Sequence, residues 1–402
     1  MDNFQVVSVG KKLNRFRIFF YSNSFQLGKS LADAGADVAI LTPRVHPNNY
    51  KRFESEFGVM LHHKGIRHYL APTNVRLDRY GGSFRLRMFL GEMRALLCEK
   101  PDIVVYIGIG PSLLVGVPMR PPIVIFTCWG SSEFQGDKKD IDAKKGWSTI
   151  APLGANCEDR LFRFMARWWG AMDKQTIVRK VDAVAIWHPS GYEELYKQSD
   201  ISKKVFLITK GVDLQAANTA YPGEHQFDVL FVGGILHRKG IYDLLDAFCI
   251  VNKEFPQAVL GIAGSGPPKN IQKLEDRIRK LPVNVCFLGD VPFPRRWSIY
   301  KSAKIFAFPS LNDFYNSALL EAMACKLPVV TTQIVDSPIE NGITGFIVPP
   351  GDINALGERL IWLLKHDKEC KQMGRLAQMK VRDWNGVSKE AIEKVFLPLL
   401  KK

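Results

Sequence analysis

The sequence predicts an α/β protein made of two doubly wound domains, each with a parallel sheet covered by helices on both faces. Two observations support this: short apolar runs alternate with helical patterns along both halves, and a segment rich in turn formers separates the halves. The 402 residues, 46% hydrophobic and 24% charged, suffice for two large cores. Paired domains of this kind face a central cleft, where the carboxyl ends of the strands bind ligands.

The first half contains five predicted strands, at residues 15–22, 37–41, 103–107, 123–127 and 183–187. A helix and a turn at Gly35 are predicted between the first two strands. The longest apolar run, residues 103–119, is short for a membrane span and is interrupted by glycines and prolines. A buried strand, a turn and a helix start explain it better.

The second half repeats the alternation more clearly. Its predicted strands are residues 228–233, 258–263, 284–288, 305–309, 328–331 and 345–348. Helices are predicted at residues 241–255, 295–302 and 317–325. The boundary falls in residues 211–226, so we predict one domain over residues 1–210 and a second over residues 211–384.

Cysteine usage and charge indicate compartment and partners. The seven cysteines form no CxxC pair, and no secretory signal opens the chain, so a cytoplasmic protein without a disulfide framework or metal site is expected.

The net charge is +15, and residues 1–210 alone hold 31 Lys and Arg against 20 Asp and Glu. A basic first half indicates an anionic partner, either a membrane surface or nucleic acid.

The segment DFYNSALLEAMACKLPVVTT carries the most chemical information. Asp313 is predicted in a loop after a strand, and Glu321 one turn into the next helix. The helix start at Asn316 and Ser317 offers backbone N–H groups to a phosphate. Glu321 can accept two hydrogen bonds from a ribose diol, and Asp313 can bind hydroxyls of a transferred sugar.

This segment resembles the retaining glycosyltransferases of family 4, which have the GT-B fold. The family carries a Glu, seven residues and a second Glu, running into LLEAMACGxPVV; the match here is LLEAMACKLPVV, with Glu321 as the second carboxylate. Asp313 replaces the first Glu, and Lys326 stands where Gly is usual. The resemblance implies transfer of a sugar from a nucleotide diphosphate with retention at the anomeric carbon, and no cofactor or metal.

A second block, FVGGILHRKGIYDLLDAF, resembles the family's diphosphate loop, beginning at Gly233. Lys239 matches the family's Lys, while Gly234 occupies the position of its Arg, and Arg238 is expected to compensate. Cations beside a helix start stabilise a leaving diphosphate, because negative charge builds up there. Other segments resemble the family more weakly. This resemblance implies that Gly264 and Gly289 lie in loops around the nucleotide base, and that residues 385–402 form a final helix that crosses back to the N-terminal domain.

The N-terminal domain is expected to bind the acceptor, a lipid-linked or polysaccharide precursor. Trp129 and Glu133 follow a predicted strand, where the family often has a His beside the donor sugar. Two basic, aromatic stretches, residues 83–97 and 158–174, have the composition of interfacial helices. With the basic charge of this half, they favour peripheral docking on the inner membrane face over nucleic-acid binding, for which no recognition module is present.

Two other functions fit parts of the pattern. A glycosyltransferase-like protein without activity would explain Asp313, Gly234 and the missing glycine pair before residue 339. A GT-B nucleotide-sugar epimerase is disfavoured by the AMACKLPVV block.

Overall fold

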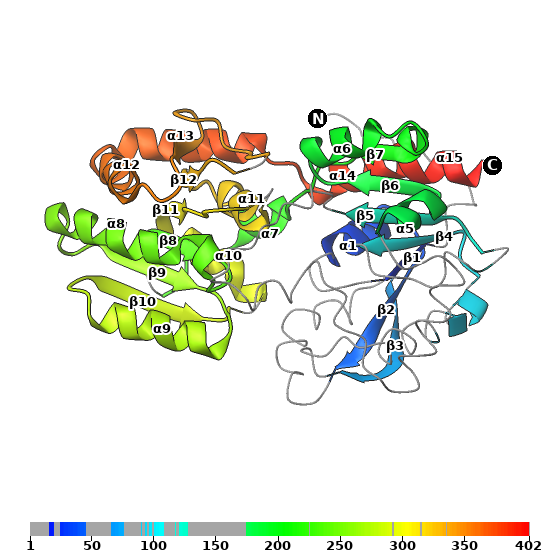
Figure 1. Ribbon diagram of the computed structural model, residues 1–402, viewed down its shortest axis with the longest axis horizontal. Coiled ribbons are helices and arrows are strands. Elements are labelled where there is room, and N and C mark those ends of the chain that lie inside the picture. The colour runs from blue at the N-terminus through cyan, green and yellow to red at the C-terminus, as the bar shows by residue number, and fades with distance from the viewer. Residues whose placement is uncertain are drawn as a thin grey trace. The chain divides into compact units, whose positions relative to one another are not determined.

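The computed structural model describes residues 16–19, 25–45, 66–75, 100–107, 120–127 and 174–401, except positions 225, 292, 314, 315 and 335. It also describes residues 90, 93, 94, 96–98 and 117. These residues form two compact units. The first contains the described residues up to Lys210 together with residues 384–401, and the second contains Gly211–Asp383. Figure 1 labels the helices and strands of both.

The first unit is built on a parallel sheet of strand order β3-β2-β1-β4-β5-β6-β7. Its strands are β1 (Phe16–Phe19), β2 (Val38–Val45), β3 (Ile66–Val75), β4 (Ile103–Ile107), β5 (Ile123–Thr127), β6 (Ala183–Ile186) and β7 (Val205–Leu207). Its described helices before the second unit include α1 (Phe25–Asp33), α5 (Lys174–Lys180) and α6 (Pro189–Tyr196). The five predicted strands are present: β4 and β5 have the predicted bounds, and the other three have shifted ends. The sequence pattern missed β3, which contains several polar residues and a proline, and β7, which is three residues long.

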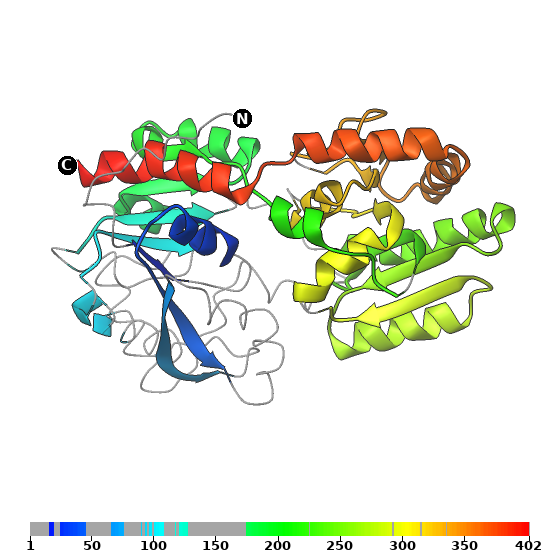
Figure 2. The same cartoon turned by 180° about the vertical axis from the view of Figure 1, so that it is seen from behind.

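The end of the chain returns to the first unit. It forms α14 (Trp384–Ala391), a π-helical turn (Ile392–Phe396) and α15 (Leu397–Leu400). The indole of Trp384 meets Trp187 edge to face with ring centroids 5.9 Å apart, and Phe396 lies 6.1 Å from the ring of Phe126. Figure 2 shows this red segment alongside α1, which confirms the expected crossing of the C-terminal helix.

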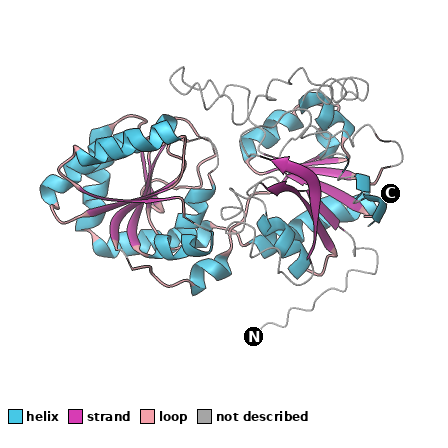
Figure 3. Cartoon of the chain, turned by 90° about the horizontal axis from the view of Figure 1, so that it is seen from below, coloured by secondary structure: helices cyan, strands magenta, loops and turns pink. Residues whose placement is uncertain are grey.

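The second unit has a parallel sheet of order β10-β9-β8-β11-β12-β13. Its strands are β8 (Phe227–Val232), β9 (Val259–Ala263), β10 (Asn284–Gly289), β11 (Ala303–Phe308), β12 (Val329–Thr332) and β13 (Gly345–Val348). Its helices include α7 (Leu214–Thr219), α8 (Ile241–Glu254), α9 (Pro268–Arg279), α10 (Phe293–Lys301), α11 (Ser317–Ala324), α12 (Ile353–Lys365) and α13 (Asp367–Lys380). Figure 3 shows helices on both faces of this sheet.

The strand order of the second unit reverses between β8 and β11. The chain proceeds from β8 outward to β9 and β10, then returns to β11 and proceeds outward on the other side. The loops that follow β8 and β11 therefore part at the carboxyl edge of the sheet, which is where doubly wound folds bind ligands. Both segments that the sequence singled out, around Lys239 and Asp313, follow these two strands.

Helix α11 ends in a Schellman motif at Lys326, the position where the family pattern has a glycine. The N–H of Leu327 donates to the carbonyl of Ala322 at 3.1 Å, and the N–H of Lys326 donates to Met323 at 3.0 Å. Lys326 itself has a φ of 64°, in the left-handed region that favours glycine. The lysine therefore occupies the glycine conformation at a cost in backbone energy.

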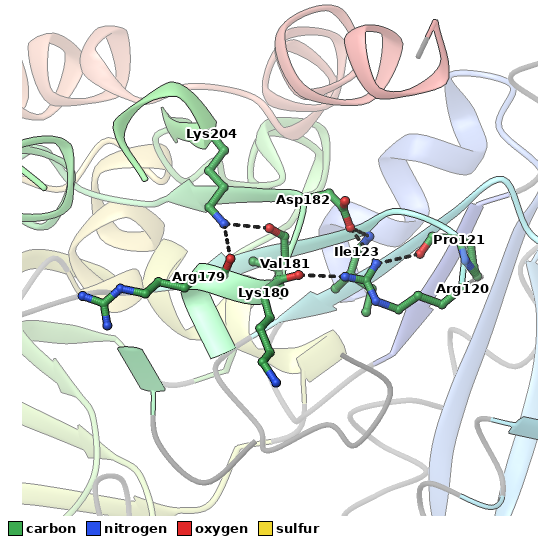
Figure 4. Close-up of polar contacts among 8 residues, drawn as sticks. All are labelled: Arg120, Pro121, Ile123, Arg179, Lys180, Val181, Asp182 and Lys204. Carbon is green, nitrogen blue, oxygen red and sulfur yellow. Dashed lines mark hydrogen bonds and ion pairs between the residues drawn. The ribbon is translucent and has the colours of Figure 1, made fainter. Parts of the chain in front are cut away.

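A polar cluster lies at the amino ends of the first unit's strands. Arg120 donates to Asp182 at 2.7 Å and to the carbonyl of Lys180 at 2.7 Å, while Asp182 also accepts from the N–H of Ile123 at 2.8 Å. Lys204 donates to two further carbonyls at the end of α5 (Figure 4). Because these contacts tie a helix end to the strand starts, they serve the fold, at the edge opposite to the carboxyl ends of the strands.

No helix among the described residues is long and apolar enough to cross a bilayer.

Candidate functional site

Three glycine-containing loops lie together at the carboxyl edge of the second sheet. Gly233 follows β8, Gly264 follows β9 and Gly289 ends β10. The N–H of Gly233 donates to the carbonyl of Ala263 at 3.0 Å, and the N–H of Gly264 donates to Gly289 at 2.7 Å. At Gly264 φ is 150°, and a Cβ there would overlap the carbonyl oxygen of Gly233. Only glycine allows the two loops to approach so closely.

Lys239 and Asp313 form a buried ion pair across the switch point. Both residues are 9% exposed, and the Lys239 ammonium donates to Oδ2 of Asp313. The ammonium also lies 5.2 Å from the ring centroid of Phe308, at the end of β11. Burial lowers the pKa of Lys239, and the Asp313 carboxylate opposes that shift. The two residues are therefore each other's charge partner before any ligand binds.

The loop that carries Lys239 is fixed by backbone contacts. The carbonyl of Arg238 accepts from the N–H of Leu311 at 2.8 Å and from the hydroxyl of Ser310 at 2.9 Å. Gly240, which precedes α8, has a φ of 70°, and a Cβ there would overlap the carbonyl of Pro309. The loop after β8 is thereby held against the loop after β11, which brings Lys239 to Asp313.

The start of α11 is joined to this pair through Asn316. Its side-chain oxygen accepts from the N–H of Ala318 at 2.8 Å, and its side-chain nitrogen donates to Oδ2 of Asp313 at 2.9 Å. Asn316 therefore caps the helix that begins at Ser317 and orients the Asp313 carboxylate. One oxygen of Asp313 thus receives two donors from within the protein.

Glu321 lies on the fifth residue of α11 and is held by two donors from α10. Its Oε1 accepts from Arg296 at 3.0 Å, and its Oε2 accepts from the hydroxyl of Tyr300 at 2.9 Å. The side chain of Glu321 is 13% exposed, and Tyr300 is fully buried. Burial, with the nearby Glu321 carboxylate, raises the pKa of Tyr300 well above its usual value, so the phenol stays protonated and donates.

Gly234 occupies the position where the family usually has an arginine, and there is room for a Cβ there. The nearest atoms to a Cβ built on Gly234 are Leu236 Cδ1 at 3.7 Å and the carbonyl oxygen of Ser265 at 3.8 Å, which is ordinary van der Waals contact. Packing therefore does not require glycine at this position, in contrast to Gly240 and Gly264.

Several predicted residues are placed elsewhere or not described. Trp129, Glu133 and the stretch 158–173 lie outside the described residues, as does most of 83–97. His188 is buried at the start of α6, where its Nδ1 accepts from the N–H of Gly191 at 3.2 Å and caps the helix. Among the described residues, no group of three His, Cys, Asp or Glu side chains is placed to hold a metal ion.

Two residues of this site were not singled out from the sequence. Arg296 and Tyr300 lie one turn apart in a helix that the pattern predicted, and i, i+4 spacing puts them on the same face. The two donors would have been found by asking which cation and hydroxyl of α10 face Glu321, but that requires the packing of α10 against α11.

The segment that carries this arrangement matches a known protein family. Residues 220–380 match the family described as glycosyl transferases group 1. A capsular polysaccharide biosynthesis glycosyltransferase, CapM of Staphylococcus aureus, is 28% identical over 160 residues, 39% of this chain and 42% of the relative. The matched stretches span about half the length of the curated relatives, between 42% and 58% for the first three.

Solved structures extend the likeness in fold over nearly the whole chain. Sucrose-phosphate synthase of Thermosynechococcus elongatus superposes with a TM-score of 0.69 at 17% identity, covering 96% of this chain and 99% of that one. HepE of Anabaena, solved with UDP and glucose, has a TM-score of 0.64 at 15% identity and covers 96% and 100%. The solved structures show that the chain has the GT-B fold, and the family match over residues 220–380 supports a glycosyltransferase family 4-like assignment of that segment.

Proposed function

We propose that this protein is a retaining glycosyltransferase that moves a sugar from a nucleoside diphosphate to a glycan or lipid-linked acceptor. One observation carries the proposal. In the segment that matches the family, Lys239 pairs with Asp313 across the switch point of a doubly wound sheet, and Glu321 lies one turn into α11, the helix that follows Asp313. The cation and the capped helix start match the diphosphate of a donor, Asp313 matches its sugar, and Glu321 matches its ribose.

The donor's diphosphate is assigned to the loop after β8 and the start of α11. The Lys239 ammonium has three N–H donors and uses one for Asp313. The other two can donate to phosphate oxygens. Arg238 is the adjacent cation. Positive charge at this place stabilises the diphosphate more strongly as it leaves, because its negative charge grows in the transition state.

Retention follows from attack on the same face that the diphosphate leaves. The acceptor hydroxyl is the nucleophile, and its proton passes to the departing diphosphate oxygen, so the new C–O bond forms as the old one breaks. The protein's share is to position the two substrates and to balance charge. No step requires a metal or an organic cofactor.

The acceptor is assigned to the first unit, with a membrane surface as the place of reaction. The surplus of positive charge in residues 1–210, 31 Lys and Arg against 20 Asp and Glu, supports this, because each basic residue near an anionic surface adds about 1 kcal/mol. Vesicle sedimentation tests it: binding should need anionic lipid and weaken with salt. Protein that stays in the supernatant with anionic vesicles at low salt contradicts membrane docking.

The experiment for the activity is a donor screen. Purified protein is incubated with labelled nucleotide sugars that vary in base and sugar, and both hydrolysis and transfer to glycan or lipid-linked acceptors are followed. Thermal unfolding with UDP, GDP and ADP runs alongside, because a ligand of the folded state raises the melting temperature. Stabilisation by a diphosphate without any turnover would favour a glycosyltransferase-like protein without activity. If none of the diphosphates stabilises the protein and no turnover is seen with any donor, the proposal is overturned.

A further inference from the structure

The carboxylate of Glu321 is held at both oxygens by side chains of a neighbouring helix. Oε1 accepts from Arg296 and Oε2 from Tyr300, at 3.0 and 2.9 Å. Arg296 and Tyr300 are four residues apart on α10, so both donors come from the same face of that helix. The carboxylate is thus fixed in position and in rotation.

The donors are themselves fixed. Tyr300 is fully buried, and its ring lies 5.6 Å from that of Phe306 on β11. Its hydroxyl remains protonated, so it donates to Glu321 and does not compete for a proton. The side chain of Arg296 is 28% exposed and that of Glu321 13% exposed, so neither side chain is completely buried.

Each oxygen of an ionised carboxylate has two acceptor positions. Arg296 uses one on Oε1 and Tyr300 uses one on Oε2, which leaves one acceptor position on each oxygen. Two acceptors, one on each oxygen of a rigid carboxylate, match two hydroxyls on adjacent carbons. A single hydroxyl, as in a deoxyribose, satisfies only one of them, and an unpaired polar group in a partly buried site lowers affinity.

We propose that Arg296 and Tyr300 are positioning residues that orient Glu321 for a vicinal diol, and that they determine the preference of the site for ribose over deoxyribose. The inference rests on the proposed function, because it takes the diol to be that of the donor nucleotide. It goes further in assigning a role to α10, a helix outside the matched motif LLEAMACKLPVV.

The test compares ribose with dideoxyribose in wild-type and variant protein. UDP, GDP and ADP and their 2′,3′-dideoxy counterparts are titrated by calorimetry. Wild-type protein should bind the ribose form of its preferred diphosphate about tenfold or more tightly than the dideoxy form. Tyr300→Phe removes only the hydroxyl and should reduce this ratio severalfold, with the affinity for the dideoxy form unchanged. A general structural defect would instead weaken both forms together.

Arginine variants supply matched controls. Arg296→Met should reduce the ribose preference, and Arg296→Lys should restore part of it. Arg295 is the exposed neighbour on the same helix, so Arg295→Met controls for the loss of one positive charge and should keep the full preference.

The outcomes separate the two proposals. Wild-type protein that binds none of the diphosphates contradicts the proposed function, and this inference with it. Wild-type protein that prefers ribose while Tyr300→Phe and Arg296→Met keep the same preference contradicts this inference alone. Folding of each variant is checked by thermal unfolding, and loss of the preference in a variant that melts like the wild type supports the inference.

Discussion

Asp313 and Glu321 belong to one motif, eight positions apart, but the structure treats them differently. One oxygen of Asp313 receives both the Lys239 ammonium and the amide of Asn316, in a buried ion pair. Glu321 receives one donor on each oxygen, from Arg296 and Tyr300 of a neighbouring helix. From this difference we expect that Asp313 mainly balances the charge of Lys239, whereas Glu321 binds a ligand. Mutations that separate stability from binding test this comparison.

The largest expected effect is on stability at Asp313. Asp313→Ala leaves the Lys239 ammonium buried without its partner, which should lower the free energy of unfolding by about 3–5 kcal/mol. Urea unfolding measures it. Asp276 forms an exposed ion pair with Arg279, so Asp276→Ala is the control and should cost less than about 1 kcal/mol. Equal small losses at both positions would show that the pair contributes nothing to stability.

The stability of Asp313→Ala should depend on pH. Burial already lowers the pKa of Lys239 in the folded protein, and loss of the carboxylate lowers it further. The unfolded state then binds more protons than the folded state below the lysine's ordinary pKa, so stability rises with pH in that window. The deficit relative to wild type should shrink between pH 7 and pH 10. A constant deficit would mean that Lys239 does not titrate.

The next effect is on turnover. Arg238→Ala should lower kcat about 100-fold while weakening donor binding much less, because charge grows on the diphosphate in the transition state. Steady-state kinetics with a calorimetric Kd for the donor separates the two. Losses of equal size in kcat/KM and in affinity, with kcat unchanged, would assign Arg238 to ground-state binding only.

A gain of affinity is expected at Gly234. A Cβ at position 234 meets no atom closer than 3.7 Å, and an arginine there would add a cation to the diphosphate loop. Gly234→Arg should tighten binding of nucleoside diphosphate by about 1–2 kcal/mol, the scale of a charged hydrogen bond. Gly234→Met controls for side-chain bulk and should give no gain. Unchanged affinity in Gly234→Arg would place the phosphates away from this loop.

The smallest effect concerns Lys326, which lies outside both carboxylate centres. Lys326→Gly relieves a left-handed backbone conformation in the Schellman motif and should raise the free energy of unfolding by about 1 kcal/mol. Activity should stay the same. Destabilisation in urea would show that the lysine side chain contributes more than its backbone conformation costs.

Most of the second unit was predictable from sequence, because its strands are continuous apolar runs and its motif is local. Strand β11 overlaps the strand predicted at residues 305–309, and helix α11 begins at Ser317, as predicted. The pairing of Lys239 with Asp313 was not predictable, since it depends on how Gly240 and Pro309 bring two loops together. The donors from α10 to Glu321 were missed for the same reason: helix packing, not periodicity, decides which side chains meet.

The first unit shows where sequence reasoning was weaker. Strand β3 was missed because its alternation includes Arg67, His68 and a proline. His188, which directly follows the predicted strand at residues 183–187, caps α6. The roles of Trp129 and Glu133 remain predictions, and variants at these two positions with an identified acceptor would test them.

The central claim is that the second unit binds a nucleoside diphosphate through Glu321. Calorimetric titration of UDP, GDP and ADP against wild-type protein and Glu321→Ala tests it directly. We predict that at least one of these diphosphates binds the wild type and that the variant, still folded, binds it about 1.5–3 kcal/mol more weakly, the range for hydrogen bonds to a charged group. The same affinity in both proteins would contradict the claim.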